Sequence, residues 1–196
     1  NHFDGFGVLD LGADACRIGW NGESYVCAAG AESTPVVETT WFGAQNYAGW
    51  LRDTTLESGF ALPTEWQFEY AASGGLSSLT NYPGDAGTAV TEFANVTGTS
   101  GADAFAEVAA VGSLRPFSGL YDLGGNVWEW TSSLHWNNGV WQTVKGGSWN
   151  QPAAYMATAY RGYYGLPQFS NGETGFRPIC NQSKSSPDGY VLIPSG

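Results

Sequence analysis

The side chains best suited to catalysis and metal binding are scarce in this chain. Its 196 residues include three cysteines and two histidines, His2 and His135. Two histidines are too few for a histidine-rich metal site, and they argue against a hydrolase that needs a Ser-His-Asp triad. Histidine-based chemistry is therefore not expected.

Cys16 and Cys27 flank a segment that is typical of a hairpin. Two strand-like pieces surround the turn residues Asn21 and Gly22, and such a hairpin could place the two sulfurs opposite each other. A disulfide and a pair of small buried thiols are both consistent with this pattern. Cys180 has no partner in either case.

Charge and composition limit the classes of partner. With 18 acidic and 7 basic side chains, the chain has a net charge of −11, which repels nucleic acids and anionic membranes. Only 13% of the residues are charged, whereas 15% are aromatic and 28 are glycine. A disordered acidic tail would have more charges and fewer aromatic rings, so we predict a compact, loop-rich globular protein.

Several features favour an extracellular, cell-surface or virion-surface location. The chain is rich in Trp and Tyr and poor in Lys, and it contains the glycosylation-type triplets Asn95-Val96-Thr97 and Asn181-Gln182-Ser183. Because the first residue is Asn, we expect a processed product or a fragment. No apolar run approaches the ~20 residues that span a bilayer, so membrane insertion is not expected.

Two helices are predicted, and both have clear start signals. The first follows Thr40, because apolar residues recur with helical spacing between Trp41 and Leu51. The second begins after Thr64, where Thr64 and Gln67 form a capping box, and it ends at the Ser-Gly-Gly sequence of residues 73–75.

The rest of the chain has few regular elements. Residues 76–120 are rich in Gly, Ser and Thr, and so long an irregular stretch needs something to hold it, for which a bound metal is one candidate. Short strands are expected over Asn126–Trp130, Gly139–Val144 and Gly175–Ile179. With neither a linker nor an internal repeat, we predict one α+β domain over residues 1–196.

Four segments, taken in order, carry a family resemblance. They are Thr34-Pro-Val-Val-Glu-Thr-Thr-Trp41-Phe-Gly-Ala44, Leu62-Pro-Thr-Glu65-Trp-Gln-Phe68-Glu69-Tyr70-Ala-Ala72, Gly119-Leu-Tyr-Asp-Leu-Gly-Gly-Asn126-Val-Trp128-Glu129-Trp130, and Lys145-Gly-Gly-Ser-Trp149 leading to Gly175-Phe-Arg177. Together they resemble the formylglycine-generating-enzyme (sulfatase-modifying factor) domain over roughly residues 18–180. The resemblance implies a C-type-lectin-like fold with two short helices, short antiparallel strands and much irregular loop. The family's usual opening strand and helix are shortened or missing, and Ala61 replaces a usual Arg.

The catalytic pair of that family is missing. Its oxidase uses two cysteines, soft thiolate ligands suited to Cu(I), and these positions fall on Gln151 and Met156. Ser148 and Trp128, which border the family's pocket, remain. We therefore expect no copper and interpret the chain as a non-catalytic binding protein. The alternatives are a divergent cysteine-free enzyme of the same fold and a structural subunit of an extracellular or virion assembly.

Residues 149–177 resemble the variable region of diversity-generating retroelement proteins, and we expect display outside the cell or on a phage or virus. In those proteins Gly-Gly-Ser-Trp and Gly-Phe-Arg bracket a ligand-binding face whose codons are rewritten at adenines. The framework matches are Ala153, Ala154, Ala159, Arg161 and Pro167. The residues expected to bind a ligand are Asn150, Tyr155, Tyr160, Gly162, Tyr163, Tyr164, Phe169, Ser170 and Asn171. Randomising the first two bases of an Asn codon can give Tyr, Gly, Phe, Ser and Asn but not Gln, Met or Glu, so Gln151, Met156, Gln168 and Glu173 would be fixed.

The composition of this segment suits a binding surface. Tyrosine provides large, rigid contact area at low entropy cost, and Ser, Gly and Asn adapt to a partner. We expect an exposed patch that contacts a protein or cell-surface ligand, on a monomer, a homo-oligomer or a larger assembly. The competing interpretation is that the tyrosines are buried or are ordinary surface residues.

The family also often holds calcium with loop oxygens, the ligands that Ca²⁺ prefers. One site maps to the side chains of Asn95 and Asp103 with the main-chain oxygens of Val96 and Phe105. The other maps to the carboxylates of Asp122 and Glu129 with the main-chain oxygens of Gly125 and Val127. We expect structural calcium, in preference to Asp122 and Asn126 only satisfying the backbone of the turn.

Overall fold

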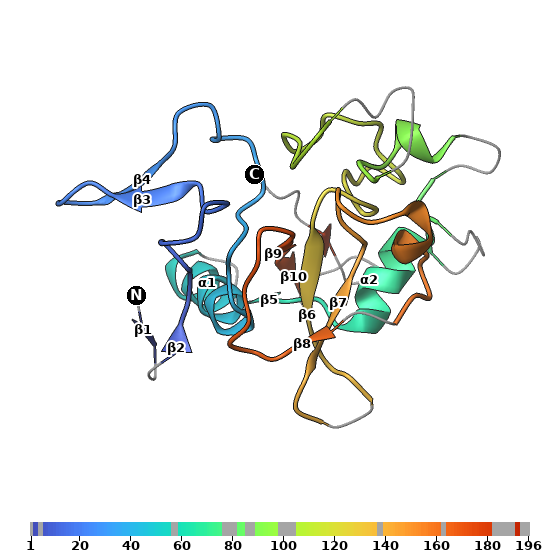
Figure 1. Ribbon diagram of the computed structural model, residues 1–196. Helices are drawn as coiled ribbons and strands as arrows, with labels where there is room; N and C mark the ends of the chain where they lie inside the picture. The colour runs from blue at the N-terminus through green and yellow to red at the C-terminus, as the bar shows by residue number, and fades with distance from the viewer. Residues whose placement is uncertain are drawn as a thin grey trace.

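Two helices and several short strands make up the regular structure of the protein. The computed structural model describes residues 2–3, 6–55, 59–75, 82–84, 89–97, 105–136, 139–161, 164–181 and 191–192. In these ranges the strands form four small sheets, joined by much irregular chain (Figure 1). The predicted α+β class is confirmed.

The central sheet contains four strands. They are β6 (Trp128–Leu134), β7 (Gln142–Lys145), β8 (Tyr164–Gly165) and β9 (Thr174–Phe176), in the order β8-β7-β6-β9. β7 is antiparallel to both β6 and β8, but β6 and β9 are parallel, which corrects the expectation of antiparallel strands alone. A parallel neighbour needs a long connection, and the segment between β7 and β9 provides it.

The remaining sheets are smaller. One contains three strands in the order β11-β10-β5: β11 (Val191–Leu192), β10 (Ile179–Cys180) and β5 (Phe60–Ala61). A second pairs β1 (His2–Phe3) with β2 (Phe6–Gly7). A third pairs β3 (Ile18–Trp20) with β4 (Tyr25–Cys27). The strand predicted over 175–179 is therefore two strands in different sheets. Pro178 separates them, because proline has no N–H to donate to a sheet ladder.

The two α-helices begin where the sequence predicts. Helix α1 (Trp41–Thr54) is capped by the Thr40 hydroxyl, which accepts a hydrogen bond from the Gly43 N–H. It extends beyond the predicted end at Leu51. Within the described residues, neither helix is long and apolar enough to cross a bilayer.

Helix α2 (Glu65–Ala72) has the predicted capping box. The Thr64 hydroxyl accepts a hydrogen bond from the Gln67 N–H, and the Gln67 side chain accepts one from the Thr64 N–H. The helix ends before Ser73, and Gly74 follows with a φ of +71°, a conformation that costs glycine little. Two 3₁₀ turns, Val90–Glu92 and Ala153–Met156, complete the helical structure of the described residues.

The hairpin of β3 and β4 is present, but its cysteines do not face each other. Ile18 pairs with Cys27, so Cys16 lies before the first strand. Cys16 and Cys27 are both free thiols, and the Cys16 thiol donates to the Ile18 carbonyl oxygen. The disulfide interpretation is therefore wrong, because the register of the hairpin sets Ile18 opposite Cys27. Cys27 is exposed, so the buried-pair interpretation fails as well.

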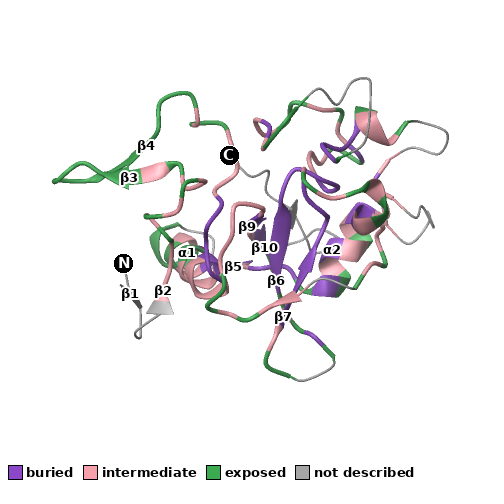
Figure 2. Cartoon of the chain, viewed as in Figure 1, coloured by how far each residue is buried: buried purple, intermediate pink, exposed green. Residues whose placement is uncertain are grey.

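The core lies around β6, where Figure 2 shows the central sheet as the most buried part of the chain. Trp128 and Trp130 are fully buried on this strand. They pack with Ala44 of α1, with Leu62 and with Val144 of β7. The central sheet and α1 thus share one apolar cluster, against which Tyr155, Tyr160 and Phe176 pack, while Phe68 and Ala72 of α2 pack with Leu123 in a second cluster.

Replacing Gly43 by Ala should destabilise the protein, although Ala favours helices more than Gly does. A Cβ atom at this position would overlap the carbonyl oxygen of Val8 and crowd the hydroxyl of Thr39. We expect a loss of about 1–3 kcal/mol in urea unfolding because the backbone must shift. Gly49→Ala in the same helix is the control, since its Cβ would meet only the flexible end of Arg52, and it should gain up to about 1 kcal/mol. Equal gains from both variants would contradict the close approach of the N-terminal segment to α1.

Candidate ligand-binding face and metal constellations

The predicted binding residues differ in exposure. Phe169 is 46% exposed, and Asn150 is exposed as well. The partly buried members are Tyr155, Tyr160, Tyr164, Ser170 and Asn171. Gly162 and Tyr163 lie outside the described residues. The segment is thus neither a fully exposed patch nor a buried core.

Tyr155 and Tyr160 both pack on the buried indole of Trp128. Their ring centroids lie 6.3 and 6.2 Å from that of Trp128, and 5.0 Å from each other. Burial raises the pKa of the Tyr160 phenol, and the neighbouring Tyr155 adds to the effect, so the hydroxyl stays protonated at neutral pH. The core therefore fixes these two rings while part of each stays exposed.

Ion pairs hold the backbone next to these rings. The buried ammonium of Lys145 lies 2.8 Å from Oε1 of Glu69 and donates to the Tyr160 carbonyl oxygen at 2.7 Å. Arg161 contacts Oε1 of Glu65 at 2.6 Å. Because both carboxylates belong to α2, this helix determines where residues 160–161 lie.

Tyr164 belongs to a second aromatic cluster at the end of the β6–β7 hairpin. Its ring stacks on Trp141 at 4.3 Å and lies 4.1 Å from the ring of His135. The neighbouring Trp136 is 71% exposed. The sequence analysis missed this cluster, because only the tertiary fold brings β8 beside the hairpin.

Met156, at one position of the family's reactive pair, and Ser148, which borders the family's pocket, have structural roles here. Met156, 1% exposed, packs with Ala94 and Val96. The buried hydroxyl of Ser148 donates to one carboxylate oxygen of Glu173 at 2.7 Å, and the Asn150 amide donates to the other at 2.9 Å. These bonds join the two ends of the predicted binding segment.

Glu38 is a buried carboxyl group that the sequence analysis did not single out. Its N–H donates to the Asn171 carbonyl oxygen at 2.9 Å. Burial raises the pKa of its carboxyl group, whereas a hydrogen bond from Ser170 lowers it and Asp10 raises it. The one sequence feature that pointed to Glu38 was its place in the first segment of the family resemblance, which begins at Thr34.

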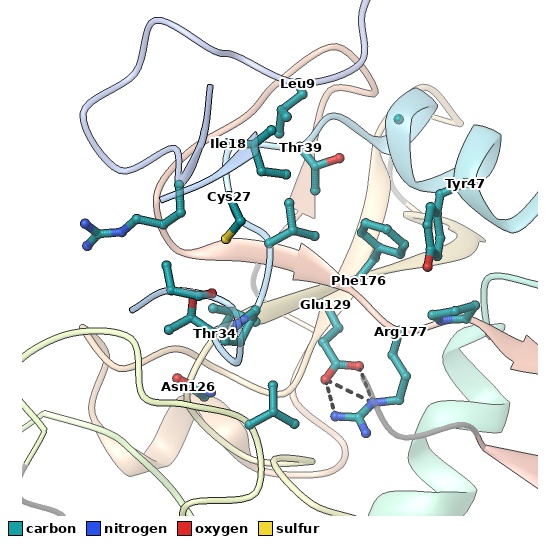
Figure 3. A pocket seen from close by; sticks show the side chains of 18 of the residues that line it. Leu9, Ile18, Cys27, Thr34, Thr39, Tyr47, Asn126, Glu129, Phe176 and Arg177 are labelled. Atoms are coloured by element: carbon teal, nitrogen blue, oxygen red, sulfur yellow. Dashed lines mark hydrogen bonds and ion pairs between the residues drawn. The ribbon is translucent and has the colours of Figure 1, made fainter. Parts of the chain in front are cut away.

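The second predicted calcium constellation contains a buried ion pair instead (Figure 3). Arg177, 1% exposed, donates to both oxygens of Glu129 at 2.7–3.2 Å and to the Asp122 carbonyl oxygen at 3.2 Å. Burial opposes the cation, but Glu129 outweighs it and raises the pKa of Arg177. Gly125 and Val127 are buried beside this pair. The residues therefore suit a guanidinium better than a calcium ion.

Asp122 has a different environment from Glu129. Its Oδ2 accepts a hydrogen bond from the Gly112 N–H at 2.8 Å. Burial nevertheless raises the pKa of the Asp122 carboxyl group above its usual value, while Gly112 and Arg177 oppose the rise. The turn bond is the role of Asp122 that the sequence analysis named as the alternative to calcium binding.

The first predicted constellation fits calcium better. Asn95 is buried, and its amide nitrogen donates to the Glu107 carbonyl oxygen at 2.8 Å, whereas its Oδ1 accepts no hydrogen bond among the described residues. Val96 is buried next to it, Phe105 is exposed, and Asp103 lies outside the described residues. The described ranges contain no group of three or more His, Cys, Asp or Glu side chains placed so that they could hold a metal ion, so amide and main-chain oxygens would have to contribute.

Comparison with known proteins identifies the family. The sulfatase-modifying factor enzyme 1-like domain matches residues 15–182. The chain belongs to this family. It is 31% identical to inactive C-alpha-formylglycine-generating enzyme 2 of Bos taurus, over 80% of this chain and 53% of that relative. The chain spans a quarter to about a half of the length of the curated relatives it matches.

Solved structures confirm the predicted formylglycine-generating-enzyme-like, C-type-lectin-like fold. PvdO from Pseudomonas aeruginosa has a TM-score of 0.63 and 26% identity, over 74% of this chain and 61% of PvdO. Treponema denticola variable protein 1 has a TM-score of 0.63 and 23% identity, over 87% of this chain and 78% of that protein.

Arg177→Met should be strongly destabilising, because it leaves the Glu129 carboxylate buried without a partner. We expect a loss of about 3–5 kcal/mol in urea unfolding. The double variant Glu129→Gln with Arg177→Met should recover a large part of this loss. The control Arg52→Met removes an exposed pair with Asp53 and should change stability by less than about 1 kcal/mol. A double variant no more stable than Arg177→Met alone would contradict this account.

Replacing Tyr155 and Tyr160 together by Ser should destabilise the fold, since both rings pack on Trp128. The loss should be about 2–4 kcal/mol in thermal or urea unfolding, less than for two fully buried aromatic residues. Phe169→Ser should stay within about 0.5 kcal/mol of wild type because Phe169 is exposed. Similar losses of stability from the two changes would contradict the distinction between rings that pack on the core and the exposed ring of Phe169.

Proposed function

We propose that this protein is a non-catalytic ligand-binding member of its family, with residues 150–171 as the binding face. The observation that carries the proposal is that the two thiolate positions hold Gln151 and Met156, of which Met156 is buried in an apolar cluster. A relative named inactive C-alpha-formylglycine-generating enzyme 2 supports it, although other relatives, such as that of Streptomyces coelicolor, are named formylglycine-generating enzyme.

The packing under the face suits recognition. Rings already fixed against Trp128 and Trp141 lose little conformational entropy when a ligand binds. Exposed Phe169 and Asn150 lie within the same segment and add apolar and polar contact groups. Such a mixture of rigid aromatic and adaptable polar residues is typical of paratopes.

The face belongs, in this proposal, to a variable protein of a diversity-generating retroelement. The fold is compatible with that role, since Treponema denticola variable protein 1 shares it. Arg161, a framework position, is held by Glu65, whereas the exposed Phe169 is at a variable one. Selection could therefore change Phe169 without disturbing the ion pair under the face.

The partner in this proposal is a protein or a cell-surface ligand met outside the cell or from a virion surface. A net charge of −11 opposes binding to nucleic acid and to anionic membranes. A homo-oligomer or a larger assembly would multiply weak contacts of the face through avidity.

Deep sequencing of the coding segment in natural populations tests the retroelement role. We expect substitutions concentrated at the eight codons for Tyr155, Tyr160, Gly162, Tyr163, Tyr164, Phe169, Ser170 and Asn171. The codons for Gln151, Met156, Gln168 and Glu173 are the internal controls and should not vary. A reverse transcriptase gene and a near-copy of the segment should lie nearby. Uniform variation without these neighbours would favour the structural-subunit alternative.

The absence of catalysis is tested separately. Wild-type protein incubated with Cu(I), oxygen and a cysteine-containing sulfatase-type peptide should give no aldehyde, as judged by hydrazide labelling and peptide mass. The variant Gln151→Cys with Met156→Cys serves as a control for copper binding at the restored thiol pair. Aldehyde formation by the wild-type chain would overturn the non-catalytic proposal.

Calcium at the Asn95 constellation is also part of the proposal, because that buried oxygen lacks a partner among the described residues. A native-state ligand raises stability by mass action, about 2.7 kcal/mol at a hundred times its Kd. Chelator should therefore lower the Tm of wild-type protein but not of Asn95→Ala, while the control Asn150→Ala should respond as wild type does. A wild-type Tm unchanged by chelator, with no calcium in elemental analysis, would remove the claim.

A further inference from the structure

A pocket on another part of the molecule has no role in the function proposed above. Its volume is about 550 Å³, within the range of roughly 300–1,000 Å³ that is common for small-molecule sites. Figure 3 shows Leu9, Ile18 and Cys27 on one side of it and Tyr47 and Phe176 on the other. None of residues 150–171 lines it.

We propose that this pocket binds a small hydrophobic amine, that is, an apolar molecule with one ammonium group. Its walls are mostly apolar and include Leu9, Ile18, Val36, Phe60, Val127 and Phe176. Tyr47 and Phe176 meet edge to face at 5.4 Å, which gives one wall a fixed aromatic surface.

Most polar groups at the other end of the pocket already form hydrogen bonds within the protein. Both oxygens of Glu129 accept hydrogen bonds from Arg177. The Asn126 amide exchanges hydrogen bonds with the Ala109 backbone, accepting at 2.9 Å and donating at 3.2 Å. A ligand can therefore not displace these groups without leaving a buried polar atom unpaired.

Asp122 is the exception at this end. Its Oδ2 accepts the Gly112 N–H, whereas its Oδ1 has no hydrogen-bond partner among the described residues. A carboxylate can only accept hydrogen bonds, so its natural complement is a donor, and a charged donor binds it most strongly. An ammonium group meets both conditions.

The charges that line the pocket favour the same ligand. Glu129 and Arg177 neutralise each other, and Arg17 is engaged by Glu107, which lies outside the pocket, at 3.4 Å. Arg177 also acts on the nearby Asp122 carboxylate, so Glu129, Arg177 and Asp122 together keep one negative charge, to which Glu32 adds another. The protein as a whole is also strongly acidic, so an anionic ligand would be repelled.

Three fluorescent probes with the same dansyl group test the proposal. Dansylcadaverine carries an ammonium group, dansylamide is neutral, and dansylglycine carries a carboxylate. In fluorescence titrations of the wild-type protein, dansylcadaverine should bind about tenfold more tightly than dansylamide, as one charged hydrogen bond predicts. Dansylglycine should bind most weakly. Equal affinities for the three probes would overturn the proposal.

A variant tests the role of Asp122. Asp122→Asn keeps an acceptor for Gly112 and removes the charge, so it should lower the dansylcadaverine affinity to that of dansylamide and leave dansylamide unchanged. Asp53→Asn is the matched control at an exposed carboxylate of α1, and it should bind all probes as wild type does. An Asp122→Asn protein that keeps the preference for the amine would also overturn the proposal.

The location of binding can be tested in the wild-type chain itself, independently of any variant. Cys27 lines the pocket, and Cys16 does not. Saturating dansylcadaverine should slow the iodoacetamide alkylation of Cys27 several-fold, as measured by mass spectrometry of each site, and leave the rate at Cys16 unchanged. Unchanged alkylation of Cys27 would place the probe elsewhere and contradict the proposal. The binding face at residues 150–171 would be unaffected by that result.

Discussion

A buried guanidinium has to be paired, and in this protein the pairing of Arg177 with Glu129 connects the parts of the fold. Glu129 lies in the middle of the chain on β6, and Arg177 lies between β9 and β10, at the point where the chain leaves the central sheet for the smaller one. The same guanidinium also holds the carbonyl oxygen of Asp122. Desolvation makes either charge costly alone, so the central sheet, the second sheet and the glycine-rich turn are fixed together.

The proposed binding face depends on this arrangement indirectly. β9 can lie parallel to β6 only if the segment before it returns across the sheet, and that segment contains the face. Trp128 and Trp141 lie under its aromatic rings, while Lys145 and Arg161 attach its backbone to α2. A family scaffold without its reactive thiolates thus still positions a set of half-exposed rings, which is what a binding protein needs.

The pocket and the face occupy different parts of one framework. The pocket lies between the N-terminal segment, α1 and the Arg177–Glu129 pair. The face begins beside β7 and α2, which hold residues 160–161, and ends at Asn171, whose carbonyl oxygen accepts the Glu38 N–H; none of its residues lines the pocket. In both proposals the Arg177–Glu129 pair only holds the surrounding chain in place and does not bind the ligand. A charge on Asp122 and a ring such as Phe169 can therefore be changed separately, which makes the two proposals independent.

Features that arise from interactions between near neighbours were predictable from the sequence. The caps at Thr40 and Thr64 are hydrogen bonds within one helical turn, and the loss of the thiolate pair is a matter of residue type alone. The family motifs likewise predicted the fold, although not the parallel pairing of β6 with β9.

Features that need distant parts of the chain were decided by the tertiary structure. The hairpin register separated Cys16 from Cys27, the fold brought Arg177 onto the oxygens of Glu129, and Tyr155 packs partly inward on Trp128. The physical reason is that local hydrogen bonds compete only with nearby alternatives, whereas buried charges and rings find partners wherever packing and desolvation cost least.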